Sequence, residues 1–234
     1  MLTLLLTLLH ADAAPTVHRL SRQFTNVYAI VGDEGVVLVD AHYPDRAEWI
    51  LKSLEKQGLS ASNVRLLVLT HGHSDHAGSA AIFQAAGIPV AVGAADAAMT
   101  EAGDHGEPIP TGLRGRILQP TLDPNFPAFT PDVLLEDVLD LSAYGIAGRV
   151  EIVGGHSGGS AAVVLDDGRI FVGDLIRGRF ICRKRPTLHF FHESIDTAHA
   201  SLTELLDAGA VEVLPGHGGP LSVKRTRRWL ERHP

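Results

Sequence analysis

The sequence predicts an α/β protein in which two β-sheets face each other and helices cover their outer sides. Strand-like apolar runs alternate with helical segments along most of the 234 residues. A strand-turn-strand pattern that begins at Asn26 also returns in the same phase at Ser160, which indicates two related halves. Two halves of this kind bury the apolar faces of both sheets when they pack against each other with helices outside.

The first half begins with a hairpin and continues as an alternation of strands and helices. From Asn26 the text "NVYAIVGDEGVVLVDA" has two β-rich runs around a Gly-Asp-Glu-Gly turn. Apolar residues at helical spacing then predict a helix that starts near Ala47 and ends at Gly58. The next predicted elements are a buried strand over 64–69, a helix over 77–86, a short strand over 89–92 and an Ala-rich helix.

Residues 103–131 are the least regular part of the chain, with Gly and Pro scattered through them. A long connection in a compact domain is typical of a lid or binding loop, and a plain surface excursion is the alternative. Strand-like runs return around 133–141, 149–153, 161–165 and 170–173. A helix over about 196–207, the strand "VEVLP", the loop "GHGG" and a basic C-terminal helix complete the chain.

The internal similarity is an ungapped match at an offset of 134 residues. "NVYAIVGDEGVVLVDAH" and "SAAVVLDDGRIFVGDLI" share their apolar pattern, an acidic turn and an aspartate near the end, Asp40 or Asp174. Two unrelated hairpins would share the apolar pattern alone. The matching aspartates therefore favour a duplication.

Composition narrows the classes of partner. The formal charge of −7 disfavours a general binder of phosphate backbones, so no nucleic acid partner is expected. Cys182 is the only cysteine, so no disulfide forms within the chain. No apolar stretch is long enough to span a membrane, and a small-molecule substrate is expected, with the oligomeric state left open.

The amino terminus resembles a targeting segment. "MLTLLLTLLHADAA" has an apolar run followed by small residues, as in a secretory cleavage site. We expect residues 1–14 to be a signal peptide or leader and residues 15–234 to form a single domain. Export would place the protein in the periplasm or outside the cell. The segment lacks basic residues, which leaves a leader on a cytoplasmic protein as the alternative.

The segment "THGHSDHAGS", residues 70–79, crowds three histidines and an aspartate into six positions. Burying a carboxylate and several imidazoles together costs free energy unless a cation interacts with them. A bound metal ion is such a cation. His71 and His73 are two residues apart, so on an extended segment they point to the same side. Asp75 and His76 come as the chain turns into a helix, which suggests a second centre beside the first.

Three more candidate ligands, His156, Asp174 and His217, also follow apolar strand-like runs. Imidazoles and carboxylates without thiolates suit zinc, with iron or manganese as competitors. Seven candidate ligands exceed the needs of one tetrahedral ion, whereas two metal ions that share a bridging hydroxide use them all. Asp40 is expected to orient a ligand histidine or to cap a turn.

Some of the other histidines are expected to be structural. For His42 both the cavity and the surface remain open. Ser157 and Ser160 stand beside His156 but lack the strand-elbow-helix setting of a serine hydrolase. The histidines expected to be hydrogen-bonded structural residues are His10, His18, His105, His199 and His233.

In this order and spacing, "THGHSDHAG", "GGHSGGS", "GDLI" and "PGHGG" resemble the metallo-β-lactamase superfamily over residues 24 to about 220. The resemblance implies an αββα sandwich of two mixed sheets with a dinuclear site at one edge. It also implies that Asp174 bridges the two metals. The implied ligands are His71, His73 and His156 for the first metal and Asp75, His76 and His217 for the second.

The expected activity is hydrolysis of a small ester, thioester or lactone by a metal-bound hydroxide, with two zinc ions per chain and Asp75 orienting the water. True β-lactamases of the superfamily usually carry Cys or Ser where Asp174 stands, and the aspartate resembles the glyoxalase II, lactonase and phosphodiesterase branches. A β-lactamase, a phosphodiesterase, an iron-dependent oxidoreductase and a non-catalytic metal-binding domain are the alternatives.

Overall fold

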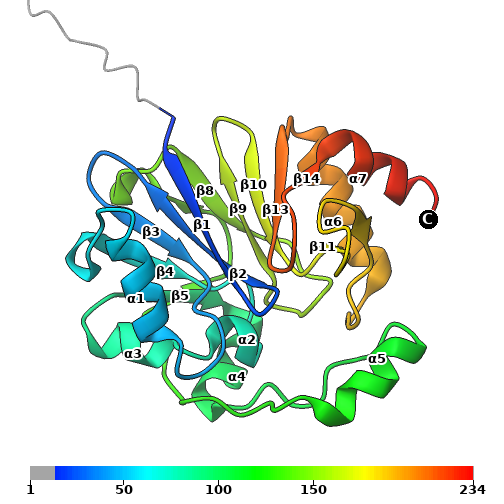
Figure 1. Ribbon diagram of the computed structural model, residues 1–234, viewed down its shortest axis with the longest axis horizontal. Coiled ribbons are helices and arrows are strands. Elements are labelled where there is room, and N and C mark those ends of the chain that lie inside the picture. Colours follow the sequence, from blue (N-terminus) through cyan, green and yellow to red (C-terminus); the bar gives the residue numbers. More distant parts are fainter. Residues whose placement is uncertain (1–13, 234) are drawn as a thin grey trace, which may run out of the picture.

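The computed structural model describes residues 14–233 and has four layers, with two sheets between two sets of helices (Figure 1). The predicted αββα sandwich of two mixed sheets is therefore confirmed. Of the predicted leader, residues 1–14, all but Ala14 lies outside the described residues.

The first sheet has six strands in the order β1-β2-β3-β4-β5-β6. β2 pairs antiparallel with both β1 and β3, and the strands from β3 to β6 pair in parallel. Its strands are β1 (Thr16–Arg22), β2 (Thr25–Val31), β3 (Val36–Val39), β4 (Val64–Val68), β5 (Val90–Gly93) and β6 (Val133–Leu135).

The second sheet has the order β14-β13-β10-β9-β8-β7, in which only β10 and β13 pair in parallel. Its strands are β7 (Leu139–Asp140), β8 (Gly148–Ile152), β9 (Ala161–Leu165), β10 (Arg169–Gly173), β13 (Glu212–Pro215) and β14 (Leu221–Ser222). β11 (Arg177–Gly178) and β12 (Pro186–Thr187) form a separate two-stranded ribbon.

The helices connect the strands and cover the outer faces. They are α1 (Ala47–Glu55), α2 (Ser74–Ala77), α3 (Ala80–Ala85), α4 (Ala97–Ala102), α5 (Leu113–Leu118), α6 (Ile195–Asp207) and α7 (Val223–Leu230). Short 3-10 turns lie at η1 (Ala61–Asn63), η2 (Ala94–Asp96), η3 (Gln119–Thr121) and η4 (Ser142–Tyr144). Within the described residues no helix has the length and apolar character needed to cross a membrane.

Alternation along the strands produces three apolar layers. In β3, Leu38 packs with Ile50 of α1 on the outer side, whereas Val37 faces the space between the sheets. The middle layer joins Val37 to Phe171 of the second sheet. Leu202 of α6 packs on the outer side of that second sheet.

The two hairpins that resemble each other in sequence occupy matching places in the two sheets. β2 and β3 form one antiparallel hairpin, and β9 and β10 form the other. Each second strand then pairs in parallel with a later strand, β3 with β4 and β10 with β13. Asp40 and Asp174 therefore emerge at corresponding sheet edges.

Two predicted elements differ from the structure. The run 133–141 is not one strand, because β6 lies in the first sheet and β7 in the second, so the chain crosses between sheets there. The helix predicted over 77–86 is divided into α2 and α3 around Gly78. Gly78 keeps right-handed helical backbone angles, and the chain leaves the helix at Ser79, where φ is −103° and ψ is 5°. The Gly78 backbone lies against Pro44, and a Cβ built there would come within 2.4 Å of the Pro44 ring, so only glycine fits this contact.

The predicted irregular segment, 103–131, contains α5 and the turn η3, which the scattered Gly and Pro hid from pattern analysis. Part of it lines the pocket beside the candidate site, as expected of a binding loop. The first strand, β1, was not predicted from the sequence. β11, β12 and β14 were also missed, because two-residue strands carry no periodicity.

Candidate metal centre

The predicted site residues meet at one edge of the sandwich, where several strands end. His71 and His73 lie on the loop after β4, and Asp75 and His76 on α2. The others come from the second half: His156 lies on the loop between β8 and β9, Asp174 follows β10, and His217 follows β13. The structure brings together all seven candidate metal ligands that were predicted from the sequence.

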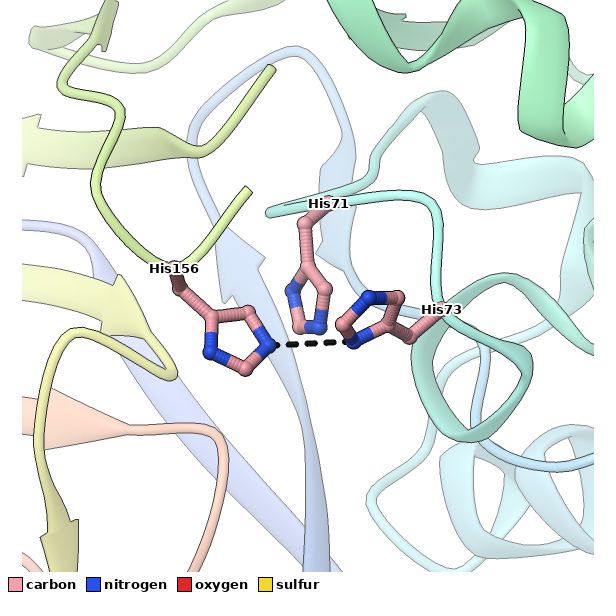
Figure 2. A group of neighbouring side chains, drawn as sticks. All are labelled: His71, His73 and His156. Atoms are coloured by element: carbon pink, nitrogen blue, oxygen red, sulfur yellow. Dashed lines mark hydrogen bonds between the residues drawn. The ribbon is translucent and has the colours of Figure 1, made fainter. Parts of the chain in front are cut away.

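Three imidazoles form the first group, His71, His73 and His156. Figure 2 shows His71 and His73 approaching from one loop and His156 from the opposite side. Nε2 of His156 lies 3.0 Å from Nδ1 of His73. The His71 ring is 4.7 Å from the His73 ring and 4.5 Å from the His156 ring, centroid to centroid. All three side chains are buried.

The second group surrounds the carboxylate of Asp174. Its Oδ2 lies 3.2 Å from Nε2 of His217 and 3.6 Å from Nε2 of His76. The same oxygen is 3.8 Å from Nε2 of His156, so Asp174 stands between the two groups. Asp75 approaches from the pocket side, with Oδ2 at 3.1 Å from Nε2 of His217.

The donor set fits metal ions. One ligand atom per residue lies within 4.8 Å of the others among His71, His73 and His156, and likewise among His76, Asp174 and His217, which is the spacing that a shared cation needs. Asp75 meets the same criterion together with His71 and His76. Nε2 of His71 and Oδ1 of Asp174 are buried and make no hydrogen bond with the described residues. Buried polar atoms without partners are rare and call for an explanation, which a bound cation supplies.

The His71 side of the site favours neutral imidazoles. Burial, together with the neighbouring imidazoles, lowers the pKa of His71 and His156 well below the ordinary value. Burial also lowers the pKa of His73 to about 4. At neutral pH these rings therefore carry no charge and keep a lone pair free, as a metal ligand must.

The Asp174 side is charged. Burial opposes a charge on His76, but Asp75, Asp40 and Asp174 outweigh it and raise the pKa of His76 well above its ordinary value. The pKa of His217 is raised to about 9 because Asp174 and Asp75 outweigh burial in the same way. Without a cation, protons on these two rings balance the carboxylates. A metal ion would take over this role and displace them.

Asp40 supports the site from behind. Its Oδ2 lies 2.8 Å from Nδ1 of His76, and its Oδ1 accepts hydrogen bonds from the backbone N–H and the hydroxyl of Thr70. The carboxylate therefore contacts both a candidate ligand histidine and the turn after β4. With Nδ1–H donated to Asp40, the His76 ring presents Nε2 to the site.

Asp96, which the sequence did not nominate, links the two histidine loops. Its buried carboxylate accepts from the backbone N–H of Gly72 at 2.8 Å and of Gly159 at 2.8 Å, and from the Ser157 hydroxyl at 2.7 Å. Gly72 lies between His71 and His73, whereas Ser157 follows His156. Asp96 therefore sets the distance between these loops, and Ser157 is engaged as a donor, which agrees with its exclusion as a nucleophile.

His189 was also missed, since no strand-like run precedes it. Its Nε2 lies 3.1 Å from Oδ2 of Asp174, and its ring stacks on His217 at 5.4 Å between centroids. Together with His156 and Asp174 it forms a further group with metal-ligand spacing. Histidine in the run "TLHFFH" was the available signal, but only the fold shows that the run returns to Asp174.

His192 is buried, 5.4 Å from the His156 ring, centroid to centroid, and neither of its ring nitrogens has a hydrogen-bond partner among the described residues. His42, His105 and His199 have structural surroundings. His42 lies neither in the pocket nor on the surface, because it is buried and its Nδ1 accepts from the Tyr43 backbone N–H. His105 lines the pocket, and its Nδ1 accepts from the Ser74 backbone N–H. His199 packs edge-on against Trp229.

A cavity of about 190 Å³ opens beside the site. The candidate ligands Asp75 and His217 line one side of the cavity, and most of the other lining side chains are aromatic or aliphatic. Arg177 also lines it, buried under Phe190, with the guanidinium carbon 3.9 Å from the ring centroid. The apolar wall residues are Phe24, Leu118, Leu122, Phe180, Phe190 and Phe191.

Comparison with known proteins agrees with the fold. The model of a family described as the metallo-beta-lactamase superfamily matches residues 20–217. The chain is 27% identical over 240 residues to a Bacillus subtilis protein named probable metallo-hydrolase YflN, covering 92% of this chain and 89% of that protein.

The chain is also similar to a number of solved structures, including two at different levels of sequence identity. One is TTHA1623 in a di-iron-bound form, with a TM-score of 0.65, 27% identity, and coverage of 91% of this chain and 97% of that one. The other is BJP-1, a subclass B3 metallo-beta-lactamase of Bradyrhizobium japonicum, with a TM-score of 0.64, 20% identity, and coverage of 87% and 75%. At that identity the second likeness concerns the fold alone.

Proposed function

The chain belongs to the metallo-beta-lactamase superfamily, and from this premise we propose that it is a hydrolase that uses two metal ions to cleave a small ester, thioester or lactone. One observation carries the proposal. Seven ligand-type side chains from both halves of the chain converge beside a pocket, in two groups joined by Asp174.

The residues would divide between the two ions. His71, His73 and His156 would hold the first and Asp75, His76 and His217 the second, with Asp174 between them. Divalent cations bound there would lower the pKa of water to roughly 7 and polarise a substrate carbonyl. We propose zinc as the metal, because imidazole and carboxylate ligands suit it. Iron and manganese are the competitors, and iron is favoured as one of them because a related protein of known structure holds two irons.

Asp75 is suited to handle the proton of the attacking water. Both Asp75 and Asp174 line the pocket, but the Asp75 side chain is 19% exposed and that of Asp174 only 1%, so Asp75 is the more accessible of the two. Burial alone would raise the pKa of Asp75, but His76 and His217 outweigh burial and lower this pKa, so the carboxylate is ionised and can accept a hydrogen bond from the attacking water. From the same place it can return the proton to the departing oxygen or sulfur.

The pocket walls favour an acyl substrate with an apolar part. Its aromatic and aliphatic side chains exclude water from the acyl group. Tyr43 lines the same pocket, and the nearby carboxylate of Asp75, together with burial, raises the pKa of its hydroxyl. Tyr43 thus stays protonated at neutral pH and can donate a hydrogen bond to a substrate oxygen.

A panel of substrates tests the proposal with metal-loaded protein. Hydrolysis of an ester, a thioester or a lactone is expected, at rates well above those for nitrocefin and bis-p-nitrophenyl phosphate. Preferred turnover of nitrocefin would indicate a β-lactamase, and preferred turnover of the phosphodiester would indicate a phosphodiesterase. Oxygen consumption without hydrolysis would replace the proposal with an iron-dependent oxidoreductase.

We also propose that the chain is exported and that residues 1–14 are removed, because their apolar run and small residues fit a cleavage site. Amino-terminal sequencing of the protein from its native cells should find a start near Pro15. A start at Met1 in the cytoplasm would contradict export.

A further inference from the structure

Two segments at the mouth of the pocket expose an unusual number of apolar side chains. We call residues 109–122 and 179–185 together the rim. Among the described residues, eleven large hydrophobic side chains are exposed, and six of them belong to the rim. These are Ile109, Leu113, Ile117, Leu122, Phe180 and Ile181.

The backbone holds these side chains outward. Residues 179–185 form the tip of the ribbon made by β11 and β12, closed by a hydrogen bond from the Arg179 N–H to the Arg185 carbonyl. Ile181 stands at this tip and is 97% exposed. On α5, Leu113 and Ile117 lie one turn apart and are 75% and 64% exposed.

The rim continues the apolar lining of the pocket. Leu122 and Phe180 belong to both, since they line the cavity and are also partly exposed at the surface. Both segments contact Phe190 of the pocket wall, because the Thr111 N–H donates to the Phe190 carbonyl and the Phe180 ring stacks on the Phe190 ring. In Figure 1, α5 extends at the lower right, beyond the sheets and away from the outer helix layers.

The rim is also strongly basic. Neither of its segments contains an acidic residue, although the chain as a whole has a charge of −7. Its basic side chains are exposed and form no ion pair with the described residues. They are Arg114, Arg116, Arg179, Arg183, Lys184 and Arg185.

We propose that the rim is a docking surface for an anionic lipid membrane, with the pocket mouth against the headgroups. Exposed aliphatic and aromatic side chains enter the boundary of headgroups and acyl chains, while arginine and lysine meet the lipid phosphates. The apolar residues favour lipid over nucleic acid, because Ile181 and Leu113 offer nothing to a phosphate backbone. The inference deepens the proposed function, on which it rests for the substrate, since this mouth would receive esters with apolar acyl chains.

Vesicle sedimentation tests the docking surface without any turnover. The metal-loaded protein is mixed with vesicles of equal parts phosphatidylcholine and phosphatidylglycerol, or of phosphatidylcholine alone. We expect binding to the anionic vesicles, weakened by salt, and much less to the neutral ones. The double variant Ile181→Ser with Leu113→Ser should bind roughly tenfold more weakly or worse. Its matched control, Val138→Ser with Val211→Ser, removes exposed apolar residues away from the rim and should bind normally.

A charge variant separates lipid docking from general attraction to polyanions. Arg179→Gln with Lys184→Gln should weaken binding roughly tenfold or more. Absence of binding to anionic vesicles, or equal binding by the Ile181 and Leu113 variant, would overturn the proposal. Loss in the charge variant alone would indicate a polyanion site instead. Neither altered pair lines the pocket, so hydrolysis of a soluble ester should persist, and its absence in every form would instead contradict the proposed function.

Discussion

The hairpins β2–β3 and β9–β10 share one sequence pattern, yet the aspartates that follow them contribute to the site differently. Asp40 faces Nδ1 of His76 and the Thr70 loop, so it acts from behind the ligand set. Asp174 faces Nε2 of His76, His189 and His217, the atoms that point into the site.

The backbone explains the difference. In the first half the left-handed residue is the aspartate itself, with φ of 66° at Asp40. In the second half it is the preceding residue, Gly173, with φ of 49°. The turn therefore comes one residue earlier and aims Asp174 into the site. A repeated scaffold thus delivers both carboxylates to one edge, and the different backbone conformations at the ends of the two hairpins aim only Asp174 at the Nε2 atoms of the candidate ligands.

The largest expected effect comes from Asp174→Ala. This change removes the carboxylate that stands between the two groups. His217 then loses its contact with Asp174 at 3.2 Å and keeps its contact with Asp75 at 3.1 Å. Steady-state kinetics should show a loss of at least about a thousandfold in kcat, the equivalent of several kcal/mol of transition-state stabilisation. Glu101→Gln, an exposed control, should be unaffected. Near-normal turnover by Asp174→Ala would contradict the claim that Asp174, unlike Asp40, acts directly in the site.

Asp75→Ala should follow, with a loss on the order of a hundredfold to ten-thousandfold in kcat, since it removes the pocket-facing proton acceptor. Circular dichroism should show an unchanged fold, because Asp75 is the most exposed of the site carboxylates. His156→Ala should also abolish activity through loss of the first ion. Near-normal turnover in either variant would remove the proposed mechanism.

Asp40→Asn tests the other half of the comparison and should have a smaller effect. The amide that replaces Oδ2 no longer accepts from Nδ1 of His76, so the ring loses the partner that holds Nε2 toward the site. Metal affinity, measured by competition with a chelator, should fall roughly tenfold to a hundredfold. A loss as large as that of Asp174→Ala would mean that the two aspartates are equivalent.

Asp96→Asn should have the smallest effect of the four. The amide can still accept at one oxygen but loses the second. Loss of Oδ1 removes the acceptor of the Gly159 N–H, and loss of Oδ2 removes the acceptor shared by the Gly72 N–H and the Ser157 hydroxyl. Denaturant unfolding should show a loss of about 1–3 kcal/mol, and metal affinity should fall about tenfold. An unchanged unfolding curve and unchanged affinity would show that the link between the two loops is dispensable.

The fold could be predicted because its signals are local and repeated. The apolar periodicity of β2, β3, β9 and β10 and the matching Asp40 and Asp174 indicate two sheets from sequence alone. The crossing between β6 and β7 carries no such signal, since both strands are short and adjacent in one apolar run. Pairing with different sheets, rather than composition, separates them.

The candidate site could be predicted where ligands follow strands, as His71, His156 and His217 do. His189 and Asp96 were missed because the folded chain, and no local sequence pattern, brings each of them to the site. His189 reaches Asp174 through a loop, and Asp96 acts through backbone N–H groups that no sequence pattern displays. Gly216 shows the same limit, because only the fold reveals that a Cβ there would lie 2.5 Å from Oδ1 of Asp174.

Elemental analysis of the purified, metal-replete protein tests the pair of metal ions most directly. Because the seven side chains form two groups joined by Asp174, we expect close to two ions per chain, falling toward one in His156→Ala. Fewer than one ion per chain in the unaltered protein would contradict a dinuclear centre at this edge of the sandwich.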